Sequence, residues 1–384
     1  MTLDMQMVLQ WGFWLAILFV AYAYAGYPIL LWGLSHLRRR GIERAPIEPS
    51  VSFIITAYNE EKRIREKLEN TLAQDYPKDR REIIVASDCS TDETDAIVLS
   101  YAGAGVRLAR LAEKGGKEAA QKFAVESAKG EVLIFSDVAT TLPPVGIRTI
   151  VMNFADPTVG CVSSVDRFLD QDGKASGEGA YVTYEMMLRR LETAVNSLVG
   201  LSGSFFAARR EVCRPWASDL QSDFNTLLNS VRGGLRGVSD PESVGYYKNL
   251  ADERKEYDRK VRTVVRGISV FMRSLSLLNP FKYHLFAWQL LSHKLCRWMV
   301  PFALIVALMT NVLLAWESGF YRAILGCQVL FYGLAALYCW TGWLPNVSVL
   351  RLPSFFVMAN VSILDAWMRY FRGDRILYWD PSKR

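Results

Sequence analysis

An uncharged apolar segment near the N-terminus sets the first limit on how this chain folds. Residues 11–34 read WGFWLAILFVAYAYAGYPILLWGL, without an acidic or basic side chain. About 20 such residues cross the hydrocarbon core of a bilayer as a helix. A signal peptide would carry its basic residues before a shorter apolar core, whereas here Arg38, Arg39 and Arg40 follow it. The segment is therefore predicted to be a membrane anchor.

The basic cluster also predicts how this anchor is oriented. Short loops rich in Lys and Arg stay on the cytoplasmic side of a span, and the leading residues 1–10 contain neither. We therefore expect residues 1–40 to form an N-terminal transmembrane anchor in the inner (plasma) membrane. The chain that follows it is expected in the cytoplasm.

The C-terminal part of the chain is apolar as well. Two runs are each long enough to span a bilayer: residues 299–316 and 323–344. A third stretch, residues 352–371, contains Asn360 and Asp365, which are costly in hydrocarbon unless they face protein or water. The basic tail 372–384 should stay cytoplasmic, so an even number of crossings must follow the cytoplasmic domain. We expect the region 299–371 to provide two crossings and one interfacial or re-entrant segment. This gives a multi-pass protein with three spans; a fourth full span is the alternative.

Residues 266–298 join the soluble region to these spans. They carry apolar residues at helical spacing, interrupted by Arg273, Lys282, Lys294 and Arg297. This pattern is typical of amphipathic helices lying at a membrane surface. Such helices are expected either to anchor the protein or to present a lipid acceptor to a site.

Charge and cysteine content exclude other classes of protein. The formal net charge of +6 is modest, and the basic residues lie near the predicted spans, so we expect a lipid bilayer and no nucleic acid as partner. The cysteines are scattered without metal-ligand spacing, and a cytoplasmic location argues against disulfides.

Residues 50–265 have the pattern of a soluble α/β domain. The run VSFII at residues 51–55 is typical of a buried strand, and the following helix places Ile64, Leu68 and Leu72 on one face. The unit recurs with strands near residues 83–85 and 132–135. Strands that alternate with helices predict a mostly parallel sheet covered on both faces.

Polar side chains follow the successive strands of this predicted sheet. Taken singly, each fits a local role such as a turn, a cap or a solvated loop. Because the carboxyl ends of parallel strands share one edge, we expect them to converge. Together they predict a site for a polar ring, a diphosphate and a metal ion. These residues are Asn59, Glu60, Asp88, Lys114, Lys117 and Asp137.

An ordered set of motifs then carries a family resemblance. The motifs are TAYNEE, SDCSTDET, EKGGKEAA, SDVAT, SGSFFAARRE, SDFNTLL and RKVR. From residue 50 to about 300 the chain resembles membrane-anchored family 2 glycosyltransferases of the GT-A fold, the group that includes cellulose, chitin and hyaluronan synthases. The resemblance implies a Rossmann-like, mostly parallel sheet in a cytoplasmic domain, with transmembrane and interfacial helices at both ends.

The resemblance implies a role for each matching residue in binding a UDP-sugar. The uridine would be held by Ala57, Tyr58, Glu60 and Asp88. Lys117, with Lys114 nearby, would neutralise the diphosphate, and Gly203 and Ser204 would shape the sugar pocket. Asp223 matches the general base that removes a proton from the acceptor hydroxyl; the alternative for it is a helix N-cap.

One further motif concerns the leaving group. Arg259, Lys260 and Arg262 stand where processive relatives read Gln-x-x-Arg-Trp, so Arg262 would stabilise the departing diphosphate. Thr263 stands at the Trp position, a departure that weakens a chain-extending function.

A second departure from the family concerns the metal. Relatives hold Mg²⁺ or Mn²⁺ with Asp-x-Asp, whereas this chain has Asp137 followed by Ala139 at the second position. Asp137 alone could ligate the ion, because Mg²⁺ needs few protein carboxylates when a diphosphate and water complete its shell. Alternatively Lys114, Lys117 and Arg262 neutralise the diphosphate with little metal or none. A third alternative is a catalytically impaired site.

The sequence thus predicts an inverting glycosyltransferase acting at the cytoplasmic membrane face, in exopolysaccharide or cell-surface glycan synthesis. Its acceptor would be a glycan or a polyprenyl-linked sugar, and export or assembly proteins would be partners. One alternative is a processive β-glycan synthase that also translocates its product. The other is a non-catalytic membrane subunit of a polysaccharide assembly complex.

Overall fold

The computed structural model describes residues 2–169, 180–248, 253–341 and 348–374. Its contacts divide the chain into two compact units. We call residues 31–252 with 269–287 the sheet unit, and residues 1–30, 253–268 and 288–374 the helical unit.

The sheet unit contains a seven-stranded sheet in the order β3-β2-β1-β4-β6-β5-β7. Strands β1 to β4 run parallel to one another, while β6 is antiparallel to both of its neighbours, β4 and β5. The expected α/β fold with a mostly parallel sheet is therefore confirmed. The strands are β1 (Val51–Ala57), β2 (Arg81–Ser87), β3 (Val106–Arg110), β4 (Val132–Asp137), β5 (Val159–Leu169), β6 (Phe205–Arg209) and β7 (Arg236–Lys248).

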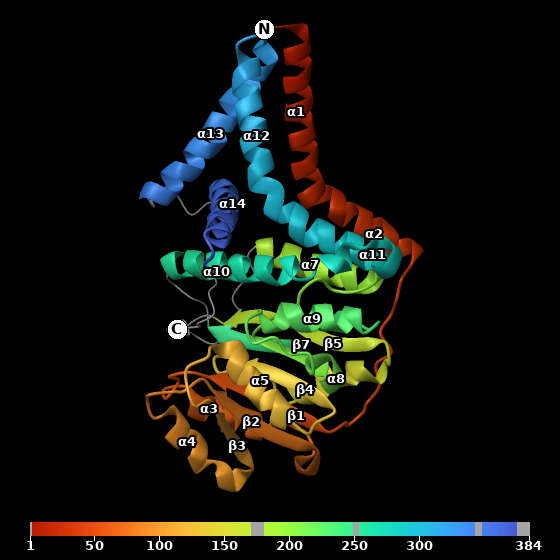
Figure 1. The fold of residues 1–384 in the computed structure, drawn as a ribbon, viewed down its shortest axis with the longest axis vertical. Helices are drawn as coiled ribbons and strands as arrows, with labels where there is room; N and C mark the ends of the chain where they lie inside the picture. The colour runs from red at the N-terminus through yellow and green to blue at the C-terminus, as the bar shows by residue number, and fades with distance from the viewer. Residues whose placement is uncertain (1, 170–179, 249–252, 342–347, 375–384) are drawn as a thin grey trace. The chain divides into compact units, whose positions relative to one another are not determined.

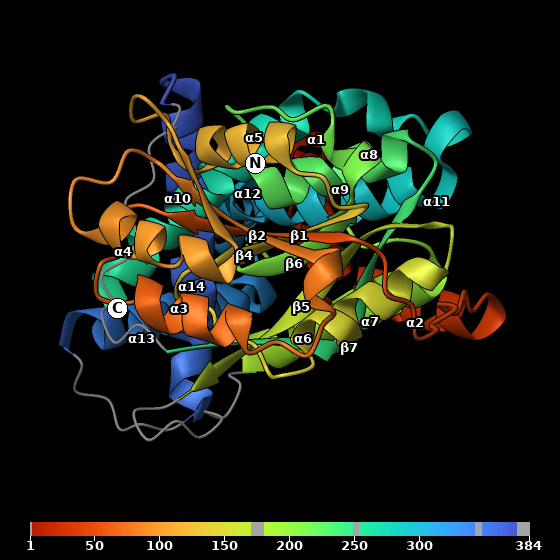
Figure 2. The same cartoon turned by 90° about the horizontal axis from the view of Figure 1, so that it is seen from below.

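Helices cover both faces of this sheet. Figure 2 shows α5, α8 and α9 on one side of the strands and α3, α4 and α6 on the other. The helices of the sheet unit are α3 (Ile64–Leu72), α4 (Thr94–Ser100), α5 (Lys117–Ser127), α6 (Gly146–Val151), α7 (Ala180–Val195), α8 (Arg210–Cys213) and α9 (Ser222–Arg232). Short 3₁₀ turns are η2 (Lys78–Arg80), η3 (Ala102–Ala104), η4 (Met152–Ala155) and η5 (Leu275–Leu278).

The alternation of side chains along β1 builds an apolar core on one face of the sheet. Phe53 and Ile55 pack with Ile64 and Leu68 of α3, together with apolar residues of α4 and α6. Every residue of β1 is buried, as expected of a central strand with helices on both faces. Burial of this apolar surface fixes the strand register, because a shift by one residue would exchange the two faces.

The register brings the strand ends to one edge. Ala57 of β1 pairs with Ser87 of β2, and Thr56 pairs with Asp137 of β4. Ser87 in turn pairs with Arg110 of β3. The segments that follow these four strands consequently start side by side.

Long helices make up most of the helical unit (Figure 1). Phe13 and Ala16 of α1 pack against Ala307 and Leu314 of α12. Its elements are α1 (Leu3–Ala21), η1 (Tyr22–Gly26), η6 (Leu291–Cys296), α12 (Arg297–Ala315), α13 (Gly319–Thr341) and α14 (Ser348–Phe371). Three helices run across the division between the units: α2 (Tyr27–Leu37), α10 (Glu253–Met272) and α11 (Pro280–Leu290).

Among the described residues, three helices are long and apolar enough to cross a membrane, namely Leu3–Leu37, Pro280–Ala315 and Gly319–Tyr338. This agrees with the three spans expected from the sequence. The second of them begins earlier than expected, because the helix runs from Pro280 through η6 into α12, with a kink at His284. Arg297 is one of the basic residues from which we expected helices at the membrane surface. It is buried in this unit, with its Nη1 3.3 Å from His293 Nε2.

Candidate functional site

Asp88 follows β2 and lies against the loop that leads into α5. Its side chain is fully buried, and its Oδ1 accepts the backbone N–H groups of Gly115 at 2.8 Å and Gly116 at 2.9 Å. Its Oδ2 has no hydrogen-bond partner among the described residues. Burial raises the pKa of this carboxyl above its usual range, and the two backbone donors oppose that rise. An orphaned buried acceptor is costly, so Oδ2 is suited to a ligand donor.

The turn after β1 carries Glu60, whose carboxylate already has a partner. The carboxylate of Glu60 is buried and accepts two hydrogen bonds of 2.8 Å from Arg63. Burial raises the pKa of Glu60, with Arg63 acting in the opposite direction. The backbone N–H of Glu60 donates to Thr94 Oγ1 at 2.7 Å. Arg63 thus already holds the carboxylate that the sequence predicted to contact uridine.

Tyr58 lies next to one of the two predicted lysines. Lys114 Nζ lies 3.9 Å from the centre of the Tyr58 ring, a cation–π contact. Ala57, which precedes Tyr58, is buried, and its carbonyl accepts the N–H of Asp88 at 3.0 Å. The ends of β1 and β2 and the loop before α5 are joined by these contacts.

Lys117 and Asp137 form an ion pair across the sheet edge. Lys117 is the first residue of α5, and its Nζ lies 2.6 Å from Asp137 Oδ1 at the end of β4. The same Nζ donates to the carbonyl of Gly203 at 3.2 Å. The Lys117 side chain is buried, whereas that of Asp137 is 27% exposed. Asp137 therefore keeps an open face for a ligand.

The turn at residues 202–204 reaches Asp223. A Cβ at Gly203 would stand 2.8 Å from Asp223 Oδ2, so this carboxylate lies against the bare backbone. Asp223 Oδ1 accepts the N–H of Phe224 at 2.8 Å, and Gln221 Nε2 donates to Oδ2 at 3.1 Å. Helix α9 begins at Ser222 with Gln221 as its N-cap. Asp223 lies in the first turn rather than at the N-cap that the sequence allowed as its alternative.

Two groups of the site were missed by the sequence analysis. Asp166 of β5 accepts hydrogen bonds from Ser202 Oγ, at 2.6 and 2.7 Å, and from Ser204 Oγ at 2.6 Å, which fixes the turn around Gly203. Lys67 of α3 donates to Ser136 Oγ at 2.7 Å, next to Asp137. Lys67 follows Ile64 by three positions, so helical spacing alone could have placed it on the apolar face of α3.

The predicted metal site can be tested against the donor set. Among the residues that the structure describes, no group of three or more His, Cys, Asp or Glu side chains could hold a metal ion. A site built from protein ligands alone therefore does not fit this part of the chain. A single carboxylate, Asp137, fits an ion that takes its remaining ligands from a diphosphate and water.

The predicted leaving-group residues Arg259, Lys260 and Arg262 lie on α10, within the helical unit. Lys260 Nζ stands 4.6 Å from the centre of the Phe355 ring of α14 in that unit. The other predicted residues all belong to the sheet unit. The role of these three at a leaving group stays a prediction.

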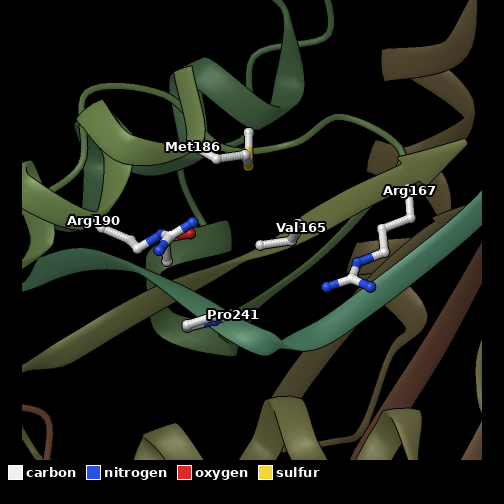
Figure 3. Close-up of a pocket in the computed structure, with 6 residues that line it drawn as sticks. Val165, Arg167, Met186, Arg190 and Pro241 are labelled. Carbon is white, nitrogen blue, oxygen red and sulfur yellow. The ribbon is translucent and has the colours of Figure 1, made fainter. Parts of the chain in front are cut away.

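A small cavity lies elsewhere in the sheet unit, between β5, β7 and α7. It has a volume of about 80 Å³, and Figure 3 shows Arg167 and Arg190 on either side of Val165. None of the predicted site residues lines it. Side chains alternate along a strand, so Val165 and Arg167 point to the face of β5 opposite Asp166. The residues lining the cavity are Val165, Arg167, Met186, Arg190, Ser239 and Pro241.

Segments of the chain are similar in sequence to known proteins. Residues 52–215 match the family described as glycosyl transferase family 2. A segment of 88 residues is 38% identical to poly(ribitol-phosphate) beta-N-acetylglucosaminyltransferase TarS of Staphylococcus aureus, covering 22% of this chain and 15% of that protein. A segment of 118 residues is 30% identical to beta-monoglucosyldiacylglycerol synthase of Synechocystis, covering 30% and 25%. The chain thus spans less than a third of these relatives.

A solved structure matches most of the chain in fold. This is the mannosyltransferase PcManGT of Pyrobaculum calidifontis in complex with GDP-Man and Mn²⁺, with a TM-score of 0.71 and 24% identity, covering 94% of this chain and 98% of that one. At this identity the likeness shows the fold. Residues 52–215 thus carry a glycosyl transferase family 2 domain, and the chain has the GT-A fold.

Proposed function

We propose that this protein transfers a sugar from a UDP-sugar to a glycan or polyprenyl-linked acceptor, with inversion at the anomeric carbon. One observation carries the proposal. The Lys117–Asp137 ion pair, the turn at Gly203 and the Asp223 carboxylate are joined by direct contacts at one edge of the sheet. A cation for a diphosphate and a carboxylate for an acceptor hydroxyl thus share one small region.

The donor would lie along the ends of β1 and β2. Asp88 Oδ2, buried and without a partner among the described residues, would accept the uracil N–H or a ribose hydroxyl. Tyr58 would flank the base, with Lys114 against its ring. Lys117 would neutralise part of the diphosphate charge, a role for which a compact ammonium is suited.

The acceptor would be activated at Asp223. Its carboxylate would take the proton of the acceptor hydroxyl as that oxygen bonds to the anomeric carbon. The bond between the anomeric carbon and the diphosphate oxygen breaks at the same time, and UDP leaves with the bonding electrons. Attack opposite the leaving group inverts the configuration. Lys117, and Arg262 as the sequence predicts, would stabilise the charge that grows on the diphosphate.

A divalent ion would complete the donor site. Asp137 would supply one carboxylate to Mg²⁺ or Mn²⁺, and the ion would supply further positive charge for the leaving diphosphate. The open face of Asp137 supports this role. The alternative, in which Lys114, Lys117 and Arg262 act with little metal or none, is supported by the short contact that Lys117 already makes.

The membrane helices support an acceptor at a lipid surface. Three helices suited to spanning would hold the catalytic domain at the cytoplasmic face of the inner membrane. One of the similar proteins is named for a glycolipid product and another for a polymer acceptor. We therefore favour a role in cell-surface glycan or exopolysaccharide synthesis, with export or assembly proteins as partners; a processive β-glycan synthase is the alternative.

The test is the size of the product. The full chain in lipid nanodiscs is incubated with labelled UDP-sugars and GDP-mannose, with a membrane lipid extract as acceptor source and with Mg²⁺, Mn²⁺ or chelator. We expect transfer of one sugar to a lipid-linked acceptor that Asp223→Asn abolishes. The matched control is Asp219→Asn, an exposed acid paired with Arg273, which should transfer like the wild type.

Other products would revise the proposal. High-mass material lost in Asp223→Asn would establish the processive alternative. Transfer retained in Asp223→Asn would remove this residue as the base. Binding of UDP without transfer from any donor would favour the non-catalytic subunit.

A further inference from the structure

Lys67 is a buried amine that the proposed chemistry does not use. It lies on α3 among the buried residues Ile64, Leu68 and Thr71, and only 2% of it is exposed. Its Nζ donates to Ser136 Oγ at 2.7 Å and to the carbonyl oxygen of Thr140 at 2.5 Å. It also lies 5.4 Å from the centre of the Phe53 ring.

The two acceptors of Lys67 stand on either side of Asp137. Ser136 precedes Asp137 in β4, and Thr140 closes the turn after it, with its N–H donating to the Asp137 carbonyl at 3.1 Å. Asp137 N–H and Thr140 Oγ1 both donate to the carbonyl of Ser204, at 3.0 and 3.3 Å. Lys67 therefore joins the strand end that carries Asp137 to the turn that carries Gly203 and Ser204.

Stability alone does not account for a lysine at this position. A Met or Leu would continue the apolar face of α3 without removing an amine from water, which is costly. Burial lowers the pKa of Lys67 to about 7, although the Asp137 charge opposes this shift. The contacts that Lys67 makes converge on the turn containing Ala139, where the second acid of the family motif is missing. Its placement fits a role in holding that turn.

We propose that Lys67 is a positioning residue that fixes the turn of residues 136–140, so that Asp137 faces the diphosphate of the donor. The proposal rests on the proposed function, because it concerns the same donor site. It assigns Lys67 to the diphosphate end and not to the nucleoside end. Asp88, which we place at the nucleoside, bonds to a different loop.

The test compares two probes that differ only in the diphosphate. Binding of UDP and of uridine, each with Mg²⁺, is measured by isothermal titration calorimetry on the full chain in nanodiscs. We expect Lys67→Met to weaken UDP binding about tenfold, as for residues that orient a ligand-binding group, while uridine binding stays within about twofold. Ser136→Ala removes one of the two acceptors of Lys67 and should also weaken UDP binding, by a smaller factor.

Controls separate this role from general damage. Lys122→Met makes the same chemical change on the exposed surface of α5 and should bind both probes like the wild type. Lys67→Met with unchanged UDP binding would overturn the proposal, and so would an equal loss of UDP and uridine. If Lys67→Met does not fold, unchanged UDP binding by Ser136→Ala would overturn it.

A different result would overturn the proposed function. A wild-type chain that binds neither UDP nor GDP would remove the donor site itself, and the role of Lys67 with it. Wild-type binding with no difference between the wild type and Lys67→Met would remove only the role of Lys67.

Discussion

The backbone of Gly203 lies against the carboxylate of Asp223, so that a Cβ at residue 203 would stand 2.8 Å from Oδ2 and 3.4 Å from the carboxyl carbon. A methyl group there must displace the carboxylate or the turn. A shift of about 1 Å in a reacting group can cost on the order of 100-fold in rate. We therefore expect Gly203→Ala to lower kcat by about 10- to 100-fold while UDP binding changes little.

Steady-state kinetics with the best donor checks this expectation. Gly103→Ala is the matched control, because a Cβ there would meet nothing within 4 Å, and it should leave kcat unchanged. If Gly203→Ala keeps the wild-type kcat, the Asp223 carboxylate does not need its present position, and the role of Asp223 as base is weakened.

Asp88 supports a second prediction, about the nucleoside. Asp88→Asn keeps an oxygen for Gly115 and Gly116 but places an amide donor where Oδ2 now lacks a partner. The NH₂ group of the amide cannot accept the uracil N–H, so uridine and UDP should both bind about 10-fold more weakly. Calorimetry with both probes checks this. Weaker binding of UDP with unchanged binding of uridine would contradict it.

The pH dependence of stability at Asp88 has a definite sign. Burial raises the pKa of this carboxyl in the folded state, so the folded chain binds more protons than the unfolded chain between the unfolded and the folded pKa. Stability from this group therefore falls as pH rises through that window. Asp88→Asn removes the cost of the buried charge and should raise Tm at neutral pH, which differential scanning fluorimetry measures.

How far the sequence predicts this site depends on the range of the contacts. The apolar runs that form β1, β2 and β4 are local signals, and the carboxyl ends of parallel strands share one edge. For this reason the sequence pattern is sufficient to place Asp88, Lys117 and Asp137 together. The family resemblance adds the GT-A architecture around them.

Other contacts could not be predicted, because nothing local encodes them. Gly203 and Ser204 reach the Asp137 end of β4 because β6 runs antiparallel to β4, a reversal that no residue pattern indicates. Asp166 pairs with serines that stand on a distant turn. Lys67 could be placed on the buried face of α3, but its acceptors follow 69 and 73 positions later in the chain.

A buried ion pair at the start of β7 supports a further prediction. Arg236 Nη2 lies 2.9 Å from Asp156 Oδ2, and both side chains are nearly inaccessible, at 3% and 7%. Removing one partner leaves the other charge buried without compensation, so Asp156→Asn should lower the free energy of unfolding by about 3 kcal/mol. Asp75→Asn, at an exposed pair with Arg148, should change it by less than about 1 kcal/mol.

The loss of stability in acid tests whether the pKa of Asp156 is lowered in the folded chain. Burial alone would raise the pKa of Asp156, but hydrogen bonds from Thr158 and Arg236 outweigh it and lower the pKa to about 2. The stabilisation is therefore present above the unfolded pKa near 3.8 and is lost as pH falls through 2. The difference in Tm between wild type and Asp156→Asn should shrink below pH 4; a constant difference would contradict this.

The last prediction concerns the stability cost of Lys67. Its pKa falls from 10.5 in the unfolded chain to about 7 in the fold, because burial disfavours the charged amine. Between these values the unfolded chain holds a proton that the folded chain lacks, so the wild type gains stability as pH rises, by at most about 1.4 kcal/mol per pH unit. Met at position 67 does not titrate. Lys67→Met should therefore be more stable than the wild type at pH 6 to 7, and this advantage should shrink towards pH 9.

Differential scanning fluorimetry across this range checks whether the advantage of Lys67→Met shrinks as pH rises. Asp137, the charged group that acts on Lys67 among the described residues, is unchanged in both proteins and does not alter the comparison. A difference in Tm independent of pH would contradict the lowered pKa. A variant that is more stable at pH 7 and yet binds UDP more weakly would show that Lys67 is kept at a cost to the fold, as expected where a residue serves a site.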